Sequence, residues 1–212
     1  MGALCGAQRS RLIAMCARTV SEAIFEKFCS SNAIKWERIQ EAEHSTPDYK
    51  VQLGGRDVFI EIKQIDEDAN FRDSNGVSTR ALGQHIRAKM AEGRRQVQFG
   101  ARKDSPAILL IYNNLDPLQM FGTEQHDFLA GMYGDLTLSL VNGCVKDSFY
   151  GRNSMLRPGF NTSFAAVGHL VSTSGGIFVH IYENSYARLP LTYEELPACI
   201  QYNRVTIEND AS

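Results

Sequence analysis

Two carboxylates and a lysine, Asp48, Glu61 and Lys63, flank a Gly54-Gly55 pair in a segment where apolar and polar residues alternate. Glycine adopts positive φ without steric cost, so this pair predicts the two-residue turn of a β-hairpin. A turn centred there places Asp48 directly opposite Glu61. Because side chains two apart on a strand point the same way, Lys63 is expected to share the face of Glu61.

These three residue types suit the chemistry of a bound divalent cation. Carboxylates opposite each other on paired strands, with β-carbons roughly 5 Å apart, repel unless a positive charge lies between them. Oxygen ligands favour Mg²⁺ or Mn²⁺ over zinc, which prefers nitrogen and sulfur. We therefore expect Asp48 and Glu61 to bind a metal, and Lys63 to orient or deprotonate an attacking water or to stabilise a pentavalent phosphate. The solvated side of an amphipathic hairpin would show the same residues.

The hairpin register also separates the side chains into two faces, and a slip of one residue would mix them. The apolar face holds Tyr49, Val51, Leu53, Val58, Ile60 and Ile62. The other face holds Asp48, Lys50, Gln52, Asp57, Glu61 and Lys63, together with Phe59.

Pro47-Asp48, followed on the next strand by Glu61-Ile62-Lys63 and preceded by a helix with a glutamate, resembles the PD-(D/E)XK nuclease superfamily, also called restriction-endonuclease-like. The resemblance covers residues 10–114. It implies a phosphodiesterase that depends on Mg²⁺ (or Mn²⁺), in which Asp48 and Glu61 bind the metal and Lys63 assists the water. Gln64 is similar to the polar residue often found after the lysine, and we include it among the catalytic candidates.

The superfamily usually adds a glutamate from the first helix, and this chain offers Glu22 and Glu26. Residues four apart lie on one face of a helix. The spacing from Glu22 to the first strand is similar to that of the superfamily, and Glu22 is therefore our catalytic candidate. The helical wheel favours Glu26 instead, because it lies nearer the apolar stripe.

Basic residues concentrate between positions 80 and 103, where seven of them accompany a single acidic residue although the whole chain carries a net charge of −2. The candidate nucleic-acid contacts are Arg80, Arg87, Lys89, Arg94 and Arg95. Arg80, Arg87 and Arg94 recur every seven residues, so they should line one side of a helix and track a phosphate backbone. A solvated basic helix face would show the same spacing. Residues 151–161 add Arg152, Asn153, Arg157 and Asn161, either as phosphate contacts or as turn residues.

Hydrophobic periodicity predicts the remaining elements. Helices are expected over 10–30, 80–102 and 123–133, and strands over 34–40, 107–112, 136–141, 163–172 and 177–182. Gly93 would break or bend the second helix. Together these elements predict an α/β, restriction-endonuclease-like fold: a central mixed β-sheet with helices on both faces. We expect one domain, with the catalytic core at 10–114, a strand-rich completion of the sheet at 115–207 and a tail at 208–212.

Composition supports no other catalytic class. The five cysteines include no CxxC pair, the five histidines include no i,i+4 pair, and neither a Gly-x-Ser-x-Gly elbow nor a Walker loop occurs. No apolar run approaches the length of a membrane span. We expect a cytoplasmic protein with reduced thiols and no membrane partner.

The function that these observations favour is a metal-dependent endonuclease acting on nucleic acid, with DNA favoured over RNA. A homodimer would supply one site for each strand of a duplex. Two alternatives stay open: a nuclease-like fold without turnover that binds nucleic acid or assembles complexes, and an interaction protein whose hairpin resembles the superfamily by coincidence.

Overall fold

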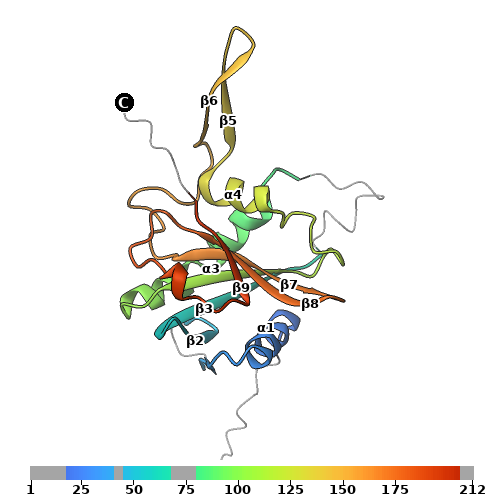
Figure 1. Ribbon diagram of the computed structural model, residues 1–212, viewed down its shortest axis with the longest axis vertical. Coiled ribbons are helices and arrows are strands. Elements are labelled where there is room, and N and C mark those ends of the chain that lie inside the picture. Colours follow the sequence, from blue (N-terminus) through green and yellow to red (C-terminus); the bar gives the residue numbers. More distant parts are fainter. Residues whose placement is uncertain (1–17, 41–44, 68–79, 206–212) are drawn as a thin grey trace, which may run out of the picture.

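A seven-stranded mixed sheet forms the centre of the computed structural model, which describes residues 18–40, 45–67 and 80–205 (Figure 1). Its strand order is β1-β2-β3-β4-β7-β8-β9, with β3–β4, β4–β7 and β8–β9 parallel and the other pairs antiparallel. The elements are α1 (Val20–Ser31), β1 (Trp36–Arg38), β2 (Tyr49–Leu53), β3 (Arg56–Ile65), α3 (Gln84–Arg102), β4 (Ala107–Asn113), α4 (Gln125–Tyr133), β5 (Leu136–Val141), β6 (Cys144–Tyr150), β7 (Ala166–Thr173), β8 (Gly176–Glu183), the 3-10 helix η1 (Tyr193–Glu195) and β9 (Ile200–Asn203). The prediction of an α/β fold around a mixed sheet is confirmed.

The hairpin of β2 and β3 has the predicted register. Leu53 pairs with Arg56 and Tyr49 pairs with Ile60, which places Asp48, one residue before β2, opposite Glu61. Gly54 and Gly55 form the turn with φ of 55° and 73°, a backbone conformation that residues with a β-carbon rarely adopt. Turn chemistry and alternation agree here, and this agreement specifies the register.

Helices cover both faces of the sheet, α1 on one and α3 with α4 on the other (Figure 1). Phe25 and Phe28 of α1 pack with the predicted apolar face of the hairpin. On the other face, α3 runs unbroken through Gly93, where an added Cβ would lie 3.0 Å from Leu109 Cδ1 and 3.5 Å from Glu61 Cγ. Gly93 thus lets the helix approach the sheet directly above Glu61, and the expected break is absent. Within the described ranges, no helix is both long and apolar enough to cross a membrane.

Two helices begin later than their periodicity suggests. Thr19 caps α1 through a capping box with Glu22, and residues 10–17 of the expected helix lie outside the described residues. Gly83, in the left-handed region with φ of 69°, precedes the start of α3. Arg80 therefore lies in the segment before the helix. The expected tail at 208–212 also falls outside the described residues.

The prediction that 136–141 completes the central sheet is wrong. This segment forms β5, which pairs with β6 in a separate two-stranded sheet that projects from the body of the molecule (Figure 1). The central sheet is completed by β7, β8 and β9 instead. Alternation predicts a strand and its apolar face, but it does not identify the partner strand.

Candidate active site

Asp48, Glu61 and Lys63 meet at one end of the β2–β3 hairpin. Lys63 Nζ lies 2.7 Å from Glu61 Oε1, and Asp48 Oδ2 accepts a hydrogen bond of 2.7 Å from the backbone N–H of Ile62. The Glu61 side chain is 2% exposed, whereas that of Lys63 is 23% exposed. The lysine is thus more open to an incoming ligand than Glu61 is.

The site places two carboxyl groups close together where solvation is poor. Burial, together with the neighbouring charge of Asp48, raises the pKa of Glu61 to about 8 against the opposing effects of Lys63 and of the backbone N–H of Asp48. Burial also raises the pKa of Asp48, although the hydrogen bond from Ile62 opposes the shift. For Lys63, burial lowers the pKa, but its hydrogen bond and ion pair with Glu61 outweigh burial, and the pKa lies above its ordinary value. Lys63 is therefore a cation at neutral pH.

One oxygen of this site has no partner in the described structure. Glu61 Oε2 is buried and makes no hydrogen bond, while Oε1 of the same carboxylate pairs with Lys63. A buried polar atom without a partner costs free energy, which a bound ion, a water or a proton would recover. With Asp48 opposite, the donor set is two carboxylates, which fits Mg²⁺ or Mn²⁺.

The two candidate glutamates of α1 have different surroundings. Glu22 accepts hydrogen bonds from Arg38 Nη2 at 3.2 and 3.3 Å and from the backbone N–H of Thr19 at 2.8 Å, and its charge raises the pKa of Asp48. Glu26 instead accepts a hydrogen bond of 2.9 Å from the buried hydroxyl of Tyr49. Glu22 is thus the glutamate that is electrostatically coupled to the hairpin carboxylates, with Arg38 already neutralising it.

Gln64 faces away from Glu61 and Lys63, as strand alternation requires. Its Oε1 accepts a 3.1 Å hydrogen bond from the backbone N–H of Ser21, in the first turn of α1. Its amide donates to Asp66 Oδ1 at 2.6 Å. Gln64 therefore connects β3 to the start of the helix that carries Glu22, and the structure places it on the opposite face from the group that it was expected to join.

Two members of the expected stripe, Arg80 and Arg87, are turned to contacts within the protein. Arg80 forms a two-pronged ion pair with Asp127, whose side chain is 0% exposed. Arg87 donates to the carbonyls of Leu82 and Ala130 at 2.7 and 3.2 Å. The helical periodicity is correct, but α4 packs beside α3 and covers this side, so Arg80 and Arg87 stabilise the contact between elements.

Other basic side chains remain open to an anionic ligand. Arg95 is exposed and, within the described part of the chain, has no ion pair. Arg94 and Arg157 both stack on Phe160, with guanidinium carbons 4.9 and 4.7 Å from the ring centre. Lys89 instead pairs with Glu92 at 2.9 Å. The strongest candidates for phosphate contacts are therefore Arg94, Arg95 and Arg157.

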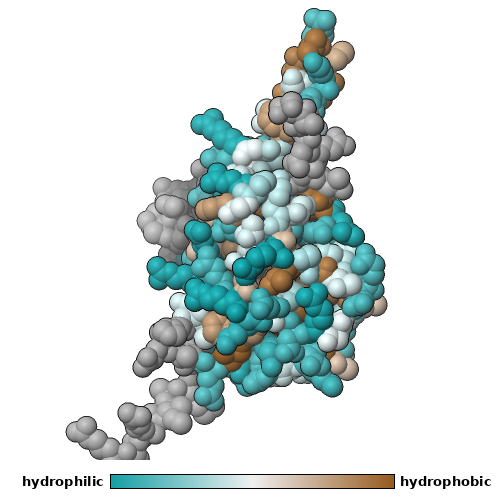
Figure 2. Space-filling view, turned by 90° about the vertical axis from the view of Figure 1, so that its left-hand side faces the viewer, coloured by the Kyte–Doolittle hydropathy of each residue, from teal (hydrophilic) through white to brown (hydrophobic). Residues whose placement is uncertain are grey.

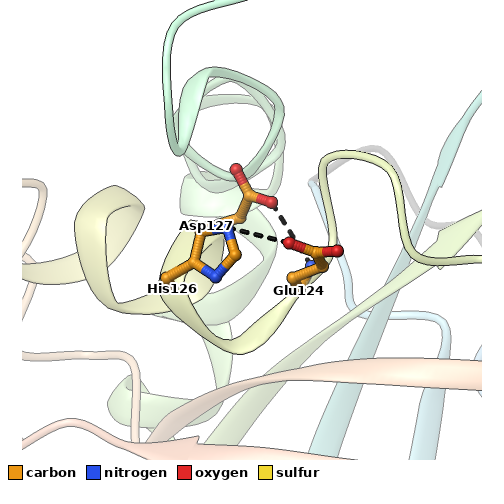
Figure 3. A group of neighbouring side chains, drawn as sticks. All are labelled: Glu124, His126 and Asp127. Atoms are coloured by element: carbon orange, nitrogen blue, oxygen red, sulfur yellow. Dashed lines mark hydrogen bonds and ion pairs between the residues drawn. The ribbon is translucent and has the colours of Figure 1, made fainter.

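A second acidic group lies at the start of α4. Among the described residues, Glu124, His126 and Asp127 are the only three side chains of metal-binding type whose ligand atoms come within 4.8 Å of one another (Figure 3). The sequence shows no metal-binding spacing for this group, although Glu124-Gln125-His126-Asp127 stands at a predicted helix start. Asp127 already accepts from Arg80 and from the backbone N–H groups of Gly83 and Glu124, and His126 lies 2.8 Å from Glu124. The group is therefore engaged in capping α4.

Comparison with known proteins does not assign this chain to a class, so the class is described by the fold and the site. No protein-family model matches this chain, and no curated protein or solved structure matches it. The fold and the site define an α/β protein with a mixed seven-stranded sheet and a buried carboxylate–lysine group at the end of a hairpin.

Proposed function

We propose that this protein is a metal-dependent nuclease of the restriction-endonuclease-like class, which hydrolyses phosphodiester bonds of nucleic acid, with DNA favoured over RNA. The observation that carries the proposal is the partnerless buried Oε2 of Glu61, next to Asp48 and Lys63. A hairpin gains no stability from a buried carboxylate of this kind. Groups with strongly shifted pKa values cluster at functional sites, because catalysis requires them.

Asp48 and Glu61 would hold Mg²⁺ or Mn²⁺. Such an ion, when bound, polarises a phosphate oxygen and lowers the pKa of a water ligand. Lys63 is cationic and partly exposed, so it can donate to a phosphate oxygen as negative charge develops there. Its raised pKa favours this role over the deprotonation of water.

The arrangement of elements also supports the proposal. A helix with Glu22, the hairpin, a second helix and the buried strand β4 follow in the order on which the resemblance rests. Arg94, Arg95 and Arg157 offer phosphate contacts outside the carboxylate group. In this proposal the basic side chains bind the backbone of the nucleic acid while the hairpin cuts it.

Cleavage of single- and double-stranded DNA and RNA in Mg²⁺ or Mn²⁺ tests the proposal. We expect the parent to cut at least one substrate, and Glu61→Ala and Lys63→Ala to lose roughly 100-fold or more in rate. The matched control is Lys50→Ala, because Lys50 lies on the same hairpin but, among the described residues, forms ion pairs only with Glu37 and Asp57, at 3.5 and 3.6 Å. This variant should cut as the parent does.

Thermal unfolding with and without Mn²⁺ separates two ways in which cleavage could fail. A ligand that binds the folded state raises its melting temperature. Stabilisation of the parent but not of Glu61→Ala, without cutting of any substrate, would favour the nucleic-acid-binding module without turnover. Absence of any Mn²⁺ effect in the parent would remove the metal-site assignment.

A further inference from the structure

The hairpin of β5 and β6, residues Leu136–Tyr150, exposes several large apolar side chains to solvent. We call this segment the arm. Six large apolar residues of the arm are 44–61% exposed: Leu136, Leu138, Leu140, Val141, Val145 and Phe149. Figure 2 shows brown, hydrophobic side chains along the projecting end of the molecule.

Four of these residues form one continuous face, which we call the leucine face, whereas Val141 and Phe149 lie on the opposite face, since Phe149 pairs with Thr137. Leu136, Leu138 and Leu140 alternate with Thr137 and Ser139, so the three leucines point to one side of β5. Val145 of β6 lies opposite Leu140 and extends the same face. Strict alternation of this kind is typical of a strand that buries one face, yet the protomer supplies nothing to bury it within the described residues.

An isolated two-stranded hairpin is at best marginally stable in water. The arm is such a hairpin, because β5 and β6 pair with each other in a separate two-stranded sheet. An apolar patch of several side chains marks an interaction surface in a soluble domain. A partner that covers the leucine face would therefore stabilise the arm itself.

The charge of the arm argues against nucleic acid as this partner. Between Leu136 and Tyr150 the charged residues are Lys146 and Asp147, one of each sign. A phosphate backbone is bound through several basic side chains. The arm offers no net positive charge, and its leucine face requires an apolar counterpart.

We propose that the leucine face of the arm packs against the same face of a second copy of this chain, related by a twofold axis. A twofold interface uses one patch on both subunits, and a stripe of aliphatic side chains is complementary to itself. The leucine face offers four large apolar side chains, Leu136, Leu138, Leu140 and Val145, whereas each side of a standard interface uses roughly 20–30 residues. The small area of this face therefore predicts a small interface and a reversible, concentration-dependent dimer.

Sedimentation at several protein concentrations, in reductant because Cys144 of the arm is exposed, tests the dimer. The variant Leu138→Glu places a charge within the proposed interface and should raise the dimer dissociation constant roughly tenfold or more. The control is Thr137→Glu, which puts the same charge on the opposite face of the same strand. We expect this control to dimerise as the parent does.

Three results would overturn the proposal: a parent that stays monomeric at all concentrations, a dimer that Leu138→Glu leaves unchanged, or equal weakening by both variants. Circular dichroism of both variants serves to check that the central sheet is intact in each comparison. The cleavage assay is independent of this test, since the dimer does not rest on nuclease activity.

Cysteine crosslinking locates the contact. In a Cys144→Ser background, Leu138→Cys should form a disulfide-linked dimer on mild oxidation, because a twofold axis through the leucine face brings the two copies of residue 138 together. Thr137→Cys in the same background should crosslink far less. Dimerisation without crosslinking at residue 138 would show that the arm contacts a different surface of the second copy, and the face-to-face arrangement would be wrong.

Discussion

At the scale of single residues, the two glutamates of α1 show how position in one helix leads to different roles. Both are nearly buried, with Glu22 9% and Glu26 7% exposed. Glu22 bonds to Arg38 and to the helix cap, close enough to Asp48 to raise its pKa. Glu26 accepts a hydrogen bond from the hydroxyl of Tyr49, a residue that is 0% exposed. The structure therefore supports Glu22 as the glutamate near the carboxylate pair and Glu26 as a core hydrogen-bond acceptor.

Replacement of Glu26 tests this division. We expect Glu26→Ala to lower the free energy of unfolding by about 1–3 kcal/mol, because the buried hydroxyl of Tyr49 would lose its acceptor. Glu26→Gln retains an acceptor oxygen and should stay within about 0.5 kcal/mol of the parent. Urea denaturation measures both values. An equal loss in the two variants would show that the charge of Glu26, and not its hydrogen bond, is what the core requires.

At the scale of elements, α3 shows that periodicity identifies a helix face without identifying its neighbour. The interval of seven residues correctly predicts that Arg87 and Arg94 share a side of the helix. That side meets α4 and the 151–161 loop, where Arg87 bonds to the carbonyl of Ala130 and Arg94 stacks on Phe160. The same packing pairs Arg80 with Asp127 at the cap of α4. Basic residues near one helix thus divide into those that hold elements together and those left for a ligand.

Arg80→Met and Arg95→Met separate these two groups. We expect Arg80→Met to destabilise the fold by about 3–5 kcal/mol, because it leaves the buried carboxylate of Asp127 without its cation. Arg95→Met should stay within about 0.5 kcal/mol of the parent, since its side chain is exposed.

Binding of an oligonucleotide over a range of salt concentrations completes this comparison. If Arg95 contacts phosphate, Arg95→Met weakens binding and reduces the salt slope by about one. Normal stability of Arg80→Met would contradict the structural role of that arginine. An unchanged salt slope for Arg95→Met would remove Arg95 from the candidate interface.

At the scale of the whole molecule, one row of side chains crosses the sheet beneath α3 and α4. Lys63, Ile111, His169 and His180 pair in sequence across β3, β4, β7 and β8. His169 is 7% exposed beneath Phe128, and its buried Nε2 has no hydrogen-bond partner among the residues that the structure describes. Burial, with a smaller effect from the neighbouring His180, lowers the pKa of His169 to about 4. The sheet therefore holds an imidazole that is neutral in the folded protein at neutral and mildly acidic pH.

This imidazole predicts a stability that falls in acid. Unfolded histidine binds a proton below its ordinary pKa of about 6.5, whereas folded His169 does so only below about 4. The neutral imidazole of His169 therefore leaves the free energy of unfolding undiminished above pH 6.5. The free energy of unfolding falls as the pH drops from 6.5 toward 4, because the unfolded chain binds a proton that folded His169 does not. Between pH 7.5 and pH 5 the loss from this one group is about 2 kcal/mol.

Urea denaturation at pH 7.5 and pH 5 measures this loss, and His169→Gln should remove most of it. The control is His126→Gln, since the side chain of His126 is 60% exposed. This variant should keep the pH dependence of the parent. If His169→Gln also keeps it, the acid sensitivity arises from other groups.

The sequence by itself determined the hairpin and the position of its charged residues. Gly54-Gly55 specifies the turn through backbone sterics, and alternation specifies which side chains share a face, so the pairing of Tyr49 with Ile60 follows from local rules. The run of apolar residues at β4 likewise predicts a buried central strand. These features depend on residues that are near one another in the chain.

Only the tertiary structure decided what each predicted face meets. The burial of Glu61 requires α3 above it, and Gly93 permits that approach. The contact of Gln64 with α1 and the exposure of the leucine face of β5 also depend on segments distant in the chain. Propensity and periodicity report the preference of a segment for its own conformation, whereas burial and partners arise from packing between segments, which no local pattern contains.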